Sequence, residues 1–169
     1  MKLLIAACLT VACSGAQAGE IRDFYEASGS PKDIATVDFM PAPPADHGIT
    51  EIGIERTICF GKCPIYTFIM KSDGTFRYAG EANVERKGTF TGTVPVEAFN
   101  WLAQFIKDSG YMQFKDGYTM QVTDLPSTYT MVVMNGQKKV VEDYGNAGPS
   151  SLLATEILID FLLEHANWN

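Results

Sequence analysis

Two tight turns that contain glycine, Asp73-Gly74 and Asn135-Gly136, do most to restrict the folds open to this chain. Each lies between two runs rich in apolar and β-branched residues, and glycine supplies the positive φ that a two-residue hairpin turn needs. Strands joined by such turns run antiparallel. The sequence therefore predicts a β-hairpin around each of these turns.

The wider pattern predicts six strands and two helices. Strands are expected over residues 49–56, 65–70, 76–80, 84–94, 128–134 and 138–144, with Gly88 as a bulge or turn in the fourth. Residues 65–70 are apolar on both faces, which indicates a central strand. Helices are expected over residues 95–110 and 152–166. The order ββββ-α-ββ-α predicts an α+β fold, an antiparallel sheet with two helices packed on one face.

Both predicted helices carry apolar faces. In the first, apolar residues recur at helical spacing from Phe99 onward, and Trp101 and Phe105 are expected to widen the buried stripe. The second is apolar nearly all round, which predicts burial on most of its surface. Ser150 or Ser151 is expected to cap this helix, because a serine hydroxyl accepts hydrogen bonds from first-turn amides.

The first 18 residues have the pattern of a secretory signal peptide. Lys2 precedes an eleven-residue apolar run, and Ala16-Gln17-Ala18 predicts cleavage after Ala18. A lipoprotein signal also ends in small residues before a cysteine, so lipid attachment at Cys13 is an alternative. The apolar run is too short to span a bilayer, and no other run predicts a transmembrane segment. We therefore expect an exported protein, periplasmic or extracellular.

The remaining chain is expected to hold one domain. Residues 19–48 form a lead-in with a proline-containing linker, and residues 49–169 form a single α+β domain. The chain has 13 basic and 20 acidic residues, a net charge of −7. Lys2 is the only charged residue of the leader, so cleavage leaves 12 basic residues and a net charge near −8. Such a chain repels nucleic acid and anionic lipid, so no nucleic-acid role is expected.

Cys59 and Cys63 are the only cysteines outside the leader. An even count at close spacing in an exported chain predicts a disulfide. Two alternatives stay open. Cys-x-x-x-Cys-Pro is similar to the metal-binding loop of copper chaperones that assemble cytochrome oxidase, which implies Cu(I) bound by two thiolates and a histidine such as His165. A thiol-redox pair is the other, although such pairs usually have two intervening residues.

No catalytic constellation appears in the sequence. The motifs Gly-x-Ser-x-Gly and His-Glu-x-x-His and the phosphate-binding loop are absent. Asp160 lies in an apolar helix and needs a partner, for which Arg56 and Lys139 are candidates. His47 is expected in a solvated loop. We predict no catalytic residue, cofactor or metal, and nothing in the sequence supports a hydrolase built on Asp124 or Asp160.

A set of motifs resembles a known family. Residues 56–66 read Arg-Thr-x-Cys-Phe-Gly-x-Cys-Pro-x-Tyr, and Asp-Gly-Thr at 73–75, Thr-Asp-x-Pro at 123–126 and Tyr-Gly at 144–145 follow. Together they resemble a family of exported bacterial domains of unknown function, over residues 49–168. The resemblance implies export, and it implies no activity, substrate or catalytic residue.

Three loops, residues 57–64, 117–127 and 145–149, are expected to cluster at one end of the sheet. The first hypothesis is a non-enzymatic module, stapled by a disulfide, that binds an envelope protein or peptide. The second is a thiol-redox or copper-handling protein that uses Cys59 and Cys63. Candidate binding residues lie in or beside these loops: Arg56, Phe60, Gly61, Lys62, Pro64, Tyr66, Tyr118, Thr123, Asp124, Pro126 and Tyr144.

Overall fold

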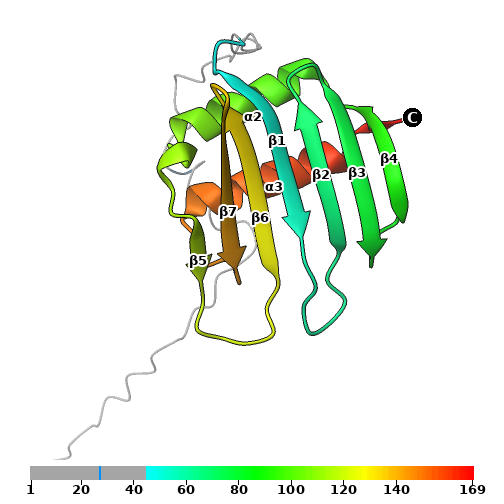
Figure 1. The fold of residues 1–169 in the computed structure, drawn as a ribbon, viewed down its shortest axis with the longest axis vertical. Coiled ribbons are helices and arrows are strands. Elements are labelled where there is room, and N and C mark those ends of the chain that lie inside the picture. Colours follow the sequence, from blue (N-terminus) through cyan, green and yellow to red (C-terminus); the bar gives the residue numbers. More distant parts are fainter. Residues whose placement is uncertain (1–26, 28–44) are drawn as a thin grey trace, which may run out of the picture. The chain divides into compact units, whose positions relative to one another are not determined.

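An eight-stranded sheet with two helices behind it organises residues 45–169, which together with Ala27 are the residues that this computed structural model describes (Figure 1). The elements in chain order are β1 (Ile49–Arg56), β2 (Ile65–Lys71), β3 (Thr75–Ala82), β4 (Gly88–Thr93), α2 (Val96–Asp108), η1 (Tyr111–Gln113), β5 (Gly117–Thr119), β6 (Ser127–Met134), β7 (Gln137–Tyr144), α3 (Ser150–Glu164) and β8 (Asn167–Trp168). The predicted leader and residues 19–26 and 28–44 of the lead-in lie outside the described residues. Within the described part, none of the helices is both long enough and apolar enough for a membrane span.

The strands lie in the order β5-β7-β6-β1-β2-β3-β4-β8. All six predicted strands and both predicted helices are present, so the mixed α and β content is confirmed. The purely antiparallel sheet is wrong, because β5 pairs parallel to β7. β5 is the edge strand beside β7 and runs in the same direction as β7, whereas β7 runs antiparallel to its other neighbour, β6. The strands β5 and β8, of three and two residues, are too short to leave a period-two pattern.

The predicted fourth strand begins later than expected. Residues 83–87 form a loop between β3 and β4, and β4 starts at Gly88. Asn83 and Gly88 have φ values of 55° and 106°, which do not continue a strand. A Cβ at Gly80 would lie 2.0 Å from the carbonyl oxygen of Arg86, so glycine there lets this loop fold back against the sheet.

The helix-facing side of the sheet forms the core. Along β2, Tyr66, Phe68 and Met70 are buried, which follows from the period-two alternation of a strand. The apolar stripe predicted for α2 is confirmed, since Phe99 and Ile106 are fully buried. This packing removes enough apolar surface from water for a domain of this size to hold its own core.

Three expectations about the helices are wrong. Trp101 is 41% exposed, and α3 leaves Leu158 and Phe161 exposed on the side turned away from the sheet. These side chains line a shallow apolar groove between α2 and α3. Neither Ser150 nor Ser151 caps α3: its N-cap is Pro149, with no hydrogen bond from a capping side chain.

His47 belongs to the packed domain and not to a solvated loop. It is buried, and its Nδ1 accepts a hydrogen bond from the Ile49 amide at 3.0 Å. Its Nε2 lies 3.2 Å from Asn100 Oδ1, so Nε2 carries the proton of the neutral ring and donates it. The ring thereby joins the start of β1 to α2, which the proline-containing linker did not predict.

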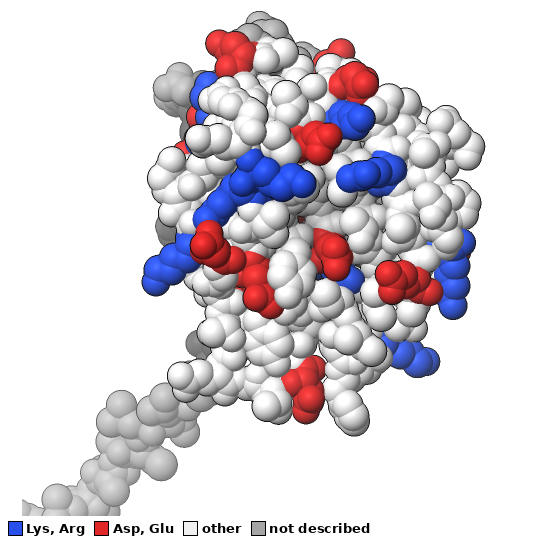
Figure 2. Space-filling model, viewed as in Figure 1, with Lys and Arg blue, Asp and Glu red and all other residues white. Residues whose placement is uncertain are grey.

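The other face of the sheet carries no helix among the described residues (Figure 1). Figure 2 views this face, on which acidic and basic side chains are interspersed among uncharged ones. Glu51 of β1 lies opposite Lys71 of β2, for example. Because neither sign of charge dominates, this face lacks the continuous basic surface that a nucleic acid requires.

The C-terminal strand closes one side of the core. A Cβ at Gly92 would lie 2.1 Å from the carbonyl oxygen of Asn167, so only glycine lets β8 pair with β4 there. The pairing places Trp168 edge-on to Phe76, Tyr78 and Phe90, with ring centroids 5.0, 5.2 and 6.1 Å apart. Edge-to-face contacts of this kind stabilise a fold beyond the burial of area.

Candidate functional site

A row of polar residues crosses the helix-facing side of the sheet at the level where β1 ends. Asp143, Thr128, Arg56 and Tyr66 are neighbours in register on β7, β6, β1 and β2. Arg56 follows the buried Ile54 by two residues, so strand alternation directs it towards the helices. We call these four residues the polar row.

Arg56 joins the polar row to α3. Its Nη2 and Nε donate to Asp160 Oδ2 at 2.6 and 3.1 Å, and its Nη1 donates to Thr128 Oγ1 at 3.0 Å. The Tyr66 hydroxyl donates to Asp160 Oδ1 at 2.5 Å. The predicted partnership of Asp160 with Arg56 is confirmed, whereas Lys139 pairs with Asp116. Burial and the Asp160 carboxylate raise the pKa of Tyr66, so this hydroxyl stays protonated and donates.

Glu156 lies one turn before Asp160 and is fully buried. Its nearest cation is Arg56, whose Nη2 is 3.8 Å from Glu156 Oε2. Neither carboxylate oxygen has a hydrogen-bond partner among residues 45–169, and Asp143 Oδ2 also lacks one there. Burial raises the pKa of Glu156 to about 7; the charges of Asp143 and Asp160 add to this effect, and Arg56 opposes it.

The polar row ends in an open cleft of about 550 Å³. Arg56, Tyr66 and Pro64 form one side, and Asp160 with Glu164 comes from α3. The remaining wall is the loop between β3 and β4 together with β8. That wall consists of Asn83, Val84, Glu85, Arg86 and Trp168, and Tyr78 of β3 and Leu163 of α3 complete the lining.

A cation already lies on an aromatic ring in this cleft. The guanidinium carbon of Arg86 is 4.7 Å from the ring centroid of Trp168, which is a cation–π contact. Tyr78 stacks on Tyr66 beside it, with ring centroids 5.7 Å apart. The cleft therefore combines aromatic walls with charged groups of both signs.

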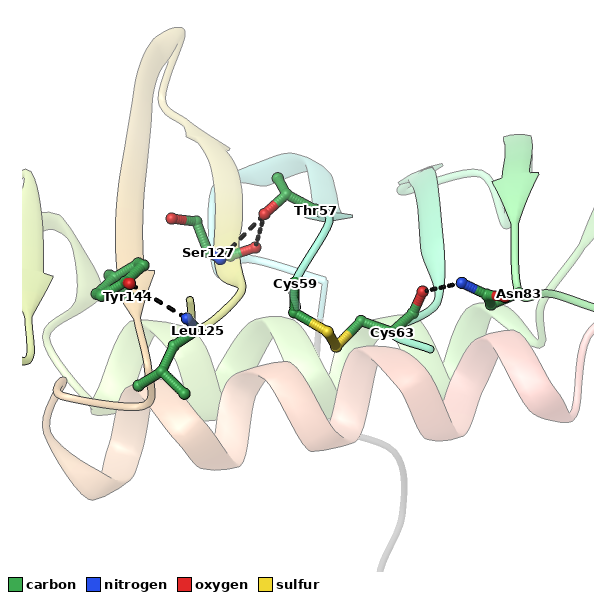
Figure 3. The surroundings of a disulfide bond; sticks show 7 residues. All are labelled: Thr57, Cys59, Cys63, Asn83, Leu125, Ser127 and Tyr144. Atoms are coloured by element: carbon green, nitrogen blue, oxygen red, sulfur yellow. Dashed lines mark hydrogen bonds between the residues drawn. A yellow bond between two sulfur atoms is a disulfide. The ribbon is translucent and has the colours of Figure 1, made fainter. Parts of the chain in front are cut away.

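The cysteine turn lies between the ends of β1 and β2, and the predicted disulfide between Cys59 and Cys63 is present (Figure 3). On one side, the Cys63 carbonyl accepts a hydrogen bond from the side-chain Nδ2 of Asn83 at 2.9 Å. On the other, the Thr57 amide donates to the Ser127 carbonyl at 3.1 Å. The closed ring is thus held from both flanks.

The predicted clustering of three loops is confirmed except at residues 117–119, which form β5 at the sheet edge. The Phe60 amide donates to the Asp124 carbonyl at 3.2 Å, which joins residues 57–64 to residues 117–127. The Gly145 amide donates to the Pro126 carbonyl at 3.1 Å, and the Tyr144 hydroxyl accepts from the Leu125 amide at 3.2 Å. We call the surface formed by residues 57–64, 120–127 and 145–149 the loop end.

The loop end presents apolar side chains to solvent. Phe60 is 90% exposed and Ile58 is 73% exposed, and both belong to the cysteine turn. Val122 and Met120, on the adjacent loop, are 56% and 45% exposed. Neighbouring exposed apolar side chains of this kind are a common feature of interaction sites, which makes the loop end a candidate binding surface.

The candidate binding residues divide between these two places. Arg56, Pro64 and Tyr66 line the cleft. The loop end holds Phe60, Gly61, Lys62, Thr123, Asp124, Pro126 and, beneath it, Tyr144. Tyr118 belongs to neither: it lies on β5 at the sheet edge, where its hydroxyl accepts a hydrogen bond from the Lys115 amide.

The residues proposed for copper are not brought together. Cys59 and Cys63 are bonded to each other, and the His165 ring contacts the Phe161 carbonyl through Nδ1 at 2.8 Å. Within the part of the chain that the structure describes, no three His, Cys, Asp or Glu side chains are placed to hold a metal.

The sequence analysis missed Arg86 and Trp168 of the cleft and Glu156, which lies beside Arg56. Glu156 and Asp160 are four apart, so helical spacing puts them on one face, and Arg56 shares a strand face with Ile54. Those two signals could have identified Glu156 as a second acidic neighbour of Arg56. Arg86 and Trp168 gave no signal, because their contact depends on how β8 pairs with β4.

Replacing both Cys59 and Cys63 by serine should leave the fold intact and lower the free energy of unfolding by about 2 kcal/mol, since the bond closes only a small loop. Urea unfolding measures the loss. Gly61→Ala is the control, because the nearest atom to the added Cβ is Cys59 Sγ at 3.7 Å and the bond should survive. Two free thiols with stoichiometric copper in the parent protein would contradict the disulfide.

Glu156→Gln should remove a pH dependence of stability. Because the Glu156 pKa is about 7 in the fold against an ordinary 4.5, the folded chain holds a proton that the unfolded chain releases. The contribution of Glu156 to stability is therefore greatest below pH 4.5 and falls as the pH rises to about 7, by up to roughly 3 kcal/mol.

Urea unfolding at several pH values tests this, with the exposed Glu164→Gln on the same helix as control. The control should keep the parent's decline between pH 4.5 and 7, and Glu156→Gln should lose it. An equal decline in both variants would mean that Glu156 titrates normally.

The comparison with protein families supports the predicted relationship. A profile described as a domain of unknown function, DUF6438, matches residues 50–163. The match runs from β1 almost to the end of α3 and so includes the cysteine turn and the polar row. No curated protein matches the chain at a significant level. The chain belongs to the DUF6438 family of domains of unknown function.

Proposed function

We propose that this protein is an exported binding module that docks a partner protein or peptide of the cell envelope on its loop end. The observation that carries the proposal is the exposure of Phe60 and Ile58 on a disulfide-closed turn that is hydrogen-bonded to the next loop. Aromatic and aliphatic side chains that a rigid loop presents to solvent are typical anchors of protein interfaces. A preorganised turn also lowers the entropy that binding costs.

A protein partner fits this surface better than a membrane does. The chain has a net charge of −7, and such a charge opposes approach to anionic lipid. Asp124 lies on the loop end itself, and its carbonyl binds the Phe60 amide. Insertion of Phe60 into lipid would carry the side-chain carboxylate of Asp124 towards the anionic headgroups. A protein surface can instead offer a basic side chain that pairs with this carboxylate.

Export to the periplasm or the cell exterior is part of the proposal. It is supported by the signal-peptide pattern of residues 1–18 and by a disulfide, which persists in oxidising compartments. In the producing cell, the mature chain should lack residues 1–18 and be released with the soluble envelope fraction. Mass spectrometry of the mature chain reads this directly. A mature chain that begins at a lipid-modified Cys13 would show that the protein is anchored to a membrane and not released. An uncleaved cytoplasmic chain would contradict export.

Photo-crosslinking at the loop end tests the docking. A benzoyl-phenylalanine at position 60 keeps an aromatic ring at the tip and should form a discrete adduct with one envelope protein. The same probe at Gln137, exposed on the opposite end of the sheet, is the matched control and should form none. Ile58→Ser should reduce the adduct at position 60 by roughly ten-fold if Ile58 and Phe60 anchor one interface.

Two results would contradict the loop-end proposal. One is an identical adduct pattern at positions 60 and 137, which would mean random collision. The other is crosslinking at position 60 to lipid alone, which would make the loop end a membrane contact.

A further inference from the structure

The cleft beside the polar row carries an excess of negative charge. Its charged lining residues are the carboxylates of Asp160, Glu85 and Glu164 and the guanidinium groups of Arg56 and Arg86. Arg56 is compensated within the fold, since two of its nitrogens bind Asp160. Among residues 45–169, no lysine or arginine lies within 4.0 Å of the Glu85 or Glu164 carboxylate. Two uncompensated carboxylates therefore face one exposed guanidinium.

The aromatic wall of the cleft suits a cation as well. Trp168 is held by edge contacts from Phe76 and Tyr78, which leave a face of its ring to Arg86. Arg86 belongs to an exposed loop and lies over the ring from outside, so another cation could take its place. Tyr78 and Leu163 supply apolar surface beside the ring. At about 550 Å³ the cleft is large enough for a side chain or a small ligand.

We propose that this cleft binds a cationic group on an apolar stem, an alkyl ammonium or a guanidinium, at the face of Trp168 that Arg86 covers. The stem would pack on Tyr78 and Leu163, and the charged end would lie among Glu85, Glu164 and the outer edge of Asp160. Arg86 then acts as an internal occupant that the ligand displaces. An anion is disfavoured, because of the two arginines that line the cleft in the described structure only Arg86, on the Trp168 ring, is not bound to a carboxylate.

This inference goes beyond the loop-end partner and does not depend on it. Phe60 and Ile58 are absent from the cleft lining, and Trp168 is absent from the loop end. Either proposal can fail without the other.

Fluorescence of Trp168 gives a local readout. The chain has two tryptophans, and replacing the exposed one by Trp101→Phe leaves Trp168 as the single reporter. The probe is a short blocked peptide with one central lysine, titrated against its twin that carries acetyl-lysine. We expect the lysine peptide to shift the emission with saturation and its acetylated twin to bind at least about ten-fold more weakly. Putrescine, titrated in the same way, distinguishes a free amine from a peptide side chain as the better source of the cation.

Variants of the charged residues in the cleft should change the affinity for the lysine peptide in opposite directions. Glu85→Gln and Glu164→Gln should each weaken binding of the lysine peptide by about two- to five-fold, the range for exposed charge pairs. Arg86→Gln should strengthen it by a similar factor, because it removes a like charge and vacates the ring. Glu81→Gln is the matched control: Glu81 is exposed on β3 outside the cleft lining, and its loss should change nothing.

The opposite pattern would overturn the proposal. If Arg86→Gln weakens binding while the two acidic variants strengthen it, the cleft selects an anion. Equal binding of the lysine peptide and its acetylated twin would make the site neutral, and no saturable signal with either amine would mean that the cleft takes no cation.

Discussion

One guanidinium group connects the two layers of this fold. Arg56 lies between its cross-strand neighbours Thr128 and Tyr66 and reaches across to Asp160 of α3. Charges are expensive to bury, and a buried pair that loses one member leaves the other uncompensated. Glu156, with no hydrogen-bond partner among the described residues, also has Arg56 as its nearest cation. The position of α3 against the sheet therefore depends on electrostatics at this end and on apolar packing along the rest of its length.

Much of the fold could be predicted because local sequence patterns determine its strands, turns and helices. Glycine turns, strand alternation and helical spacing located six strands and two helices, and the need of Asp160 for a cation pointed to Arg56 or Lys139, of which Arg56 is the partner. The polar row and the cleft could not be predicted, because they depend on register between strands far apart in sequence, such as Arg56 opposite Thr128. The exposure of Trp101 was missed for a similar reason, since an apolar side chain does not reveal whether another layer covers it.

The cysteine turn proves to be a structural link between two surfaces. Through Phe60 it meets the loop at Asp124, and through the Cys63 carbonyl it meets Asn83 at the rim of the cleft. Pro64, directly after the second cysteine, lines the cleft itself. The disulfide therefore closes the backbone at the point where the loop end and the cleft meet.

The short strands β5 and β8 have a consequence for the protein in concentrated solution. A sheet that ends in long, straight strands exposes a row of unpaired amides and carbonyls on which another chain can add a strand. Here the two outermost strands, β5 and β8, contain three and two residues. Each pairs with only part of its neighbour, β7 or β4, and so interrupts one edge of the sheet. On the β4 side, Asn169 adds a further backbone bond to Thr91. Within residues 45–169, a neighbouring copy thus finds no long regular edge to extend, and the two shortest strands protect the sheet from edge-to-edge polymerisation.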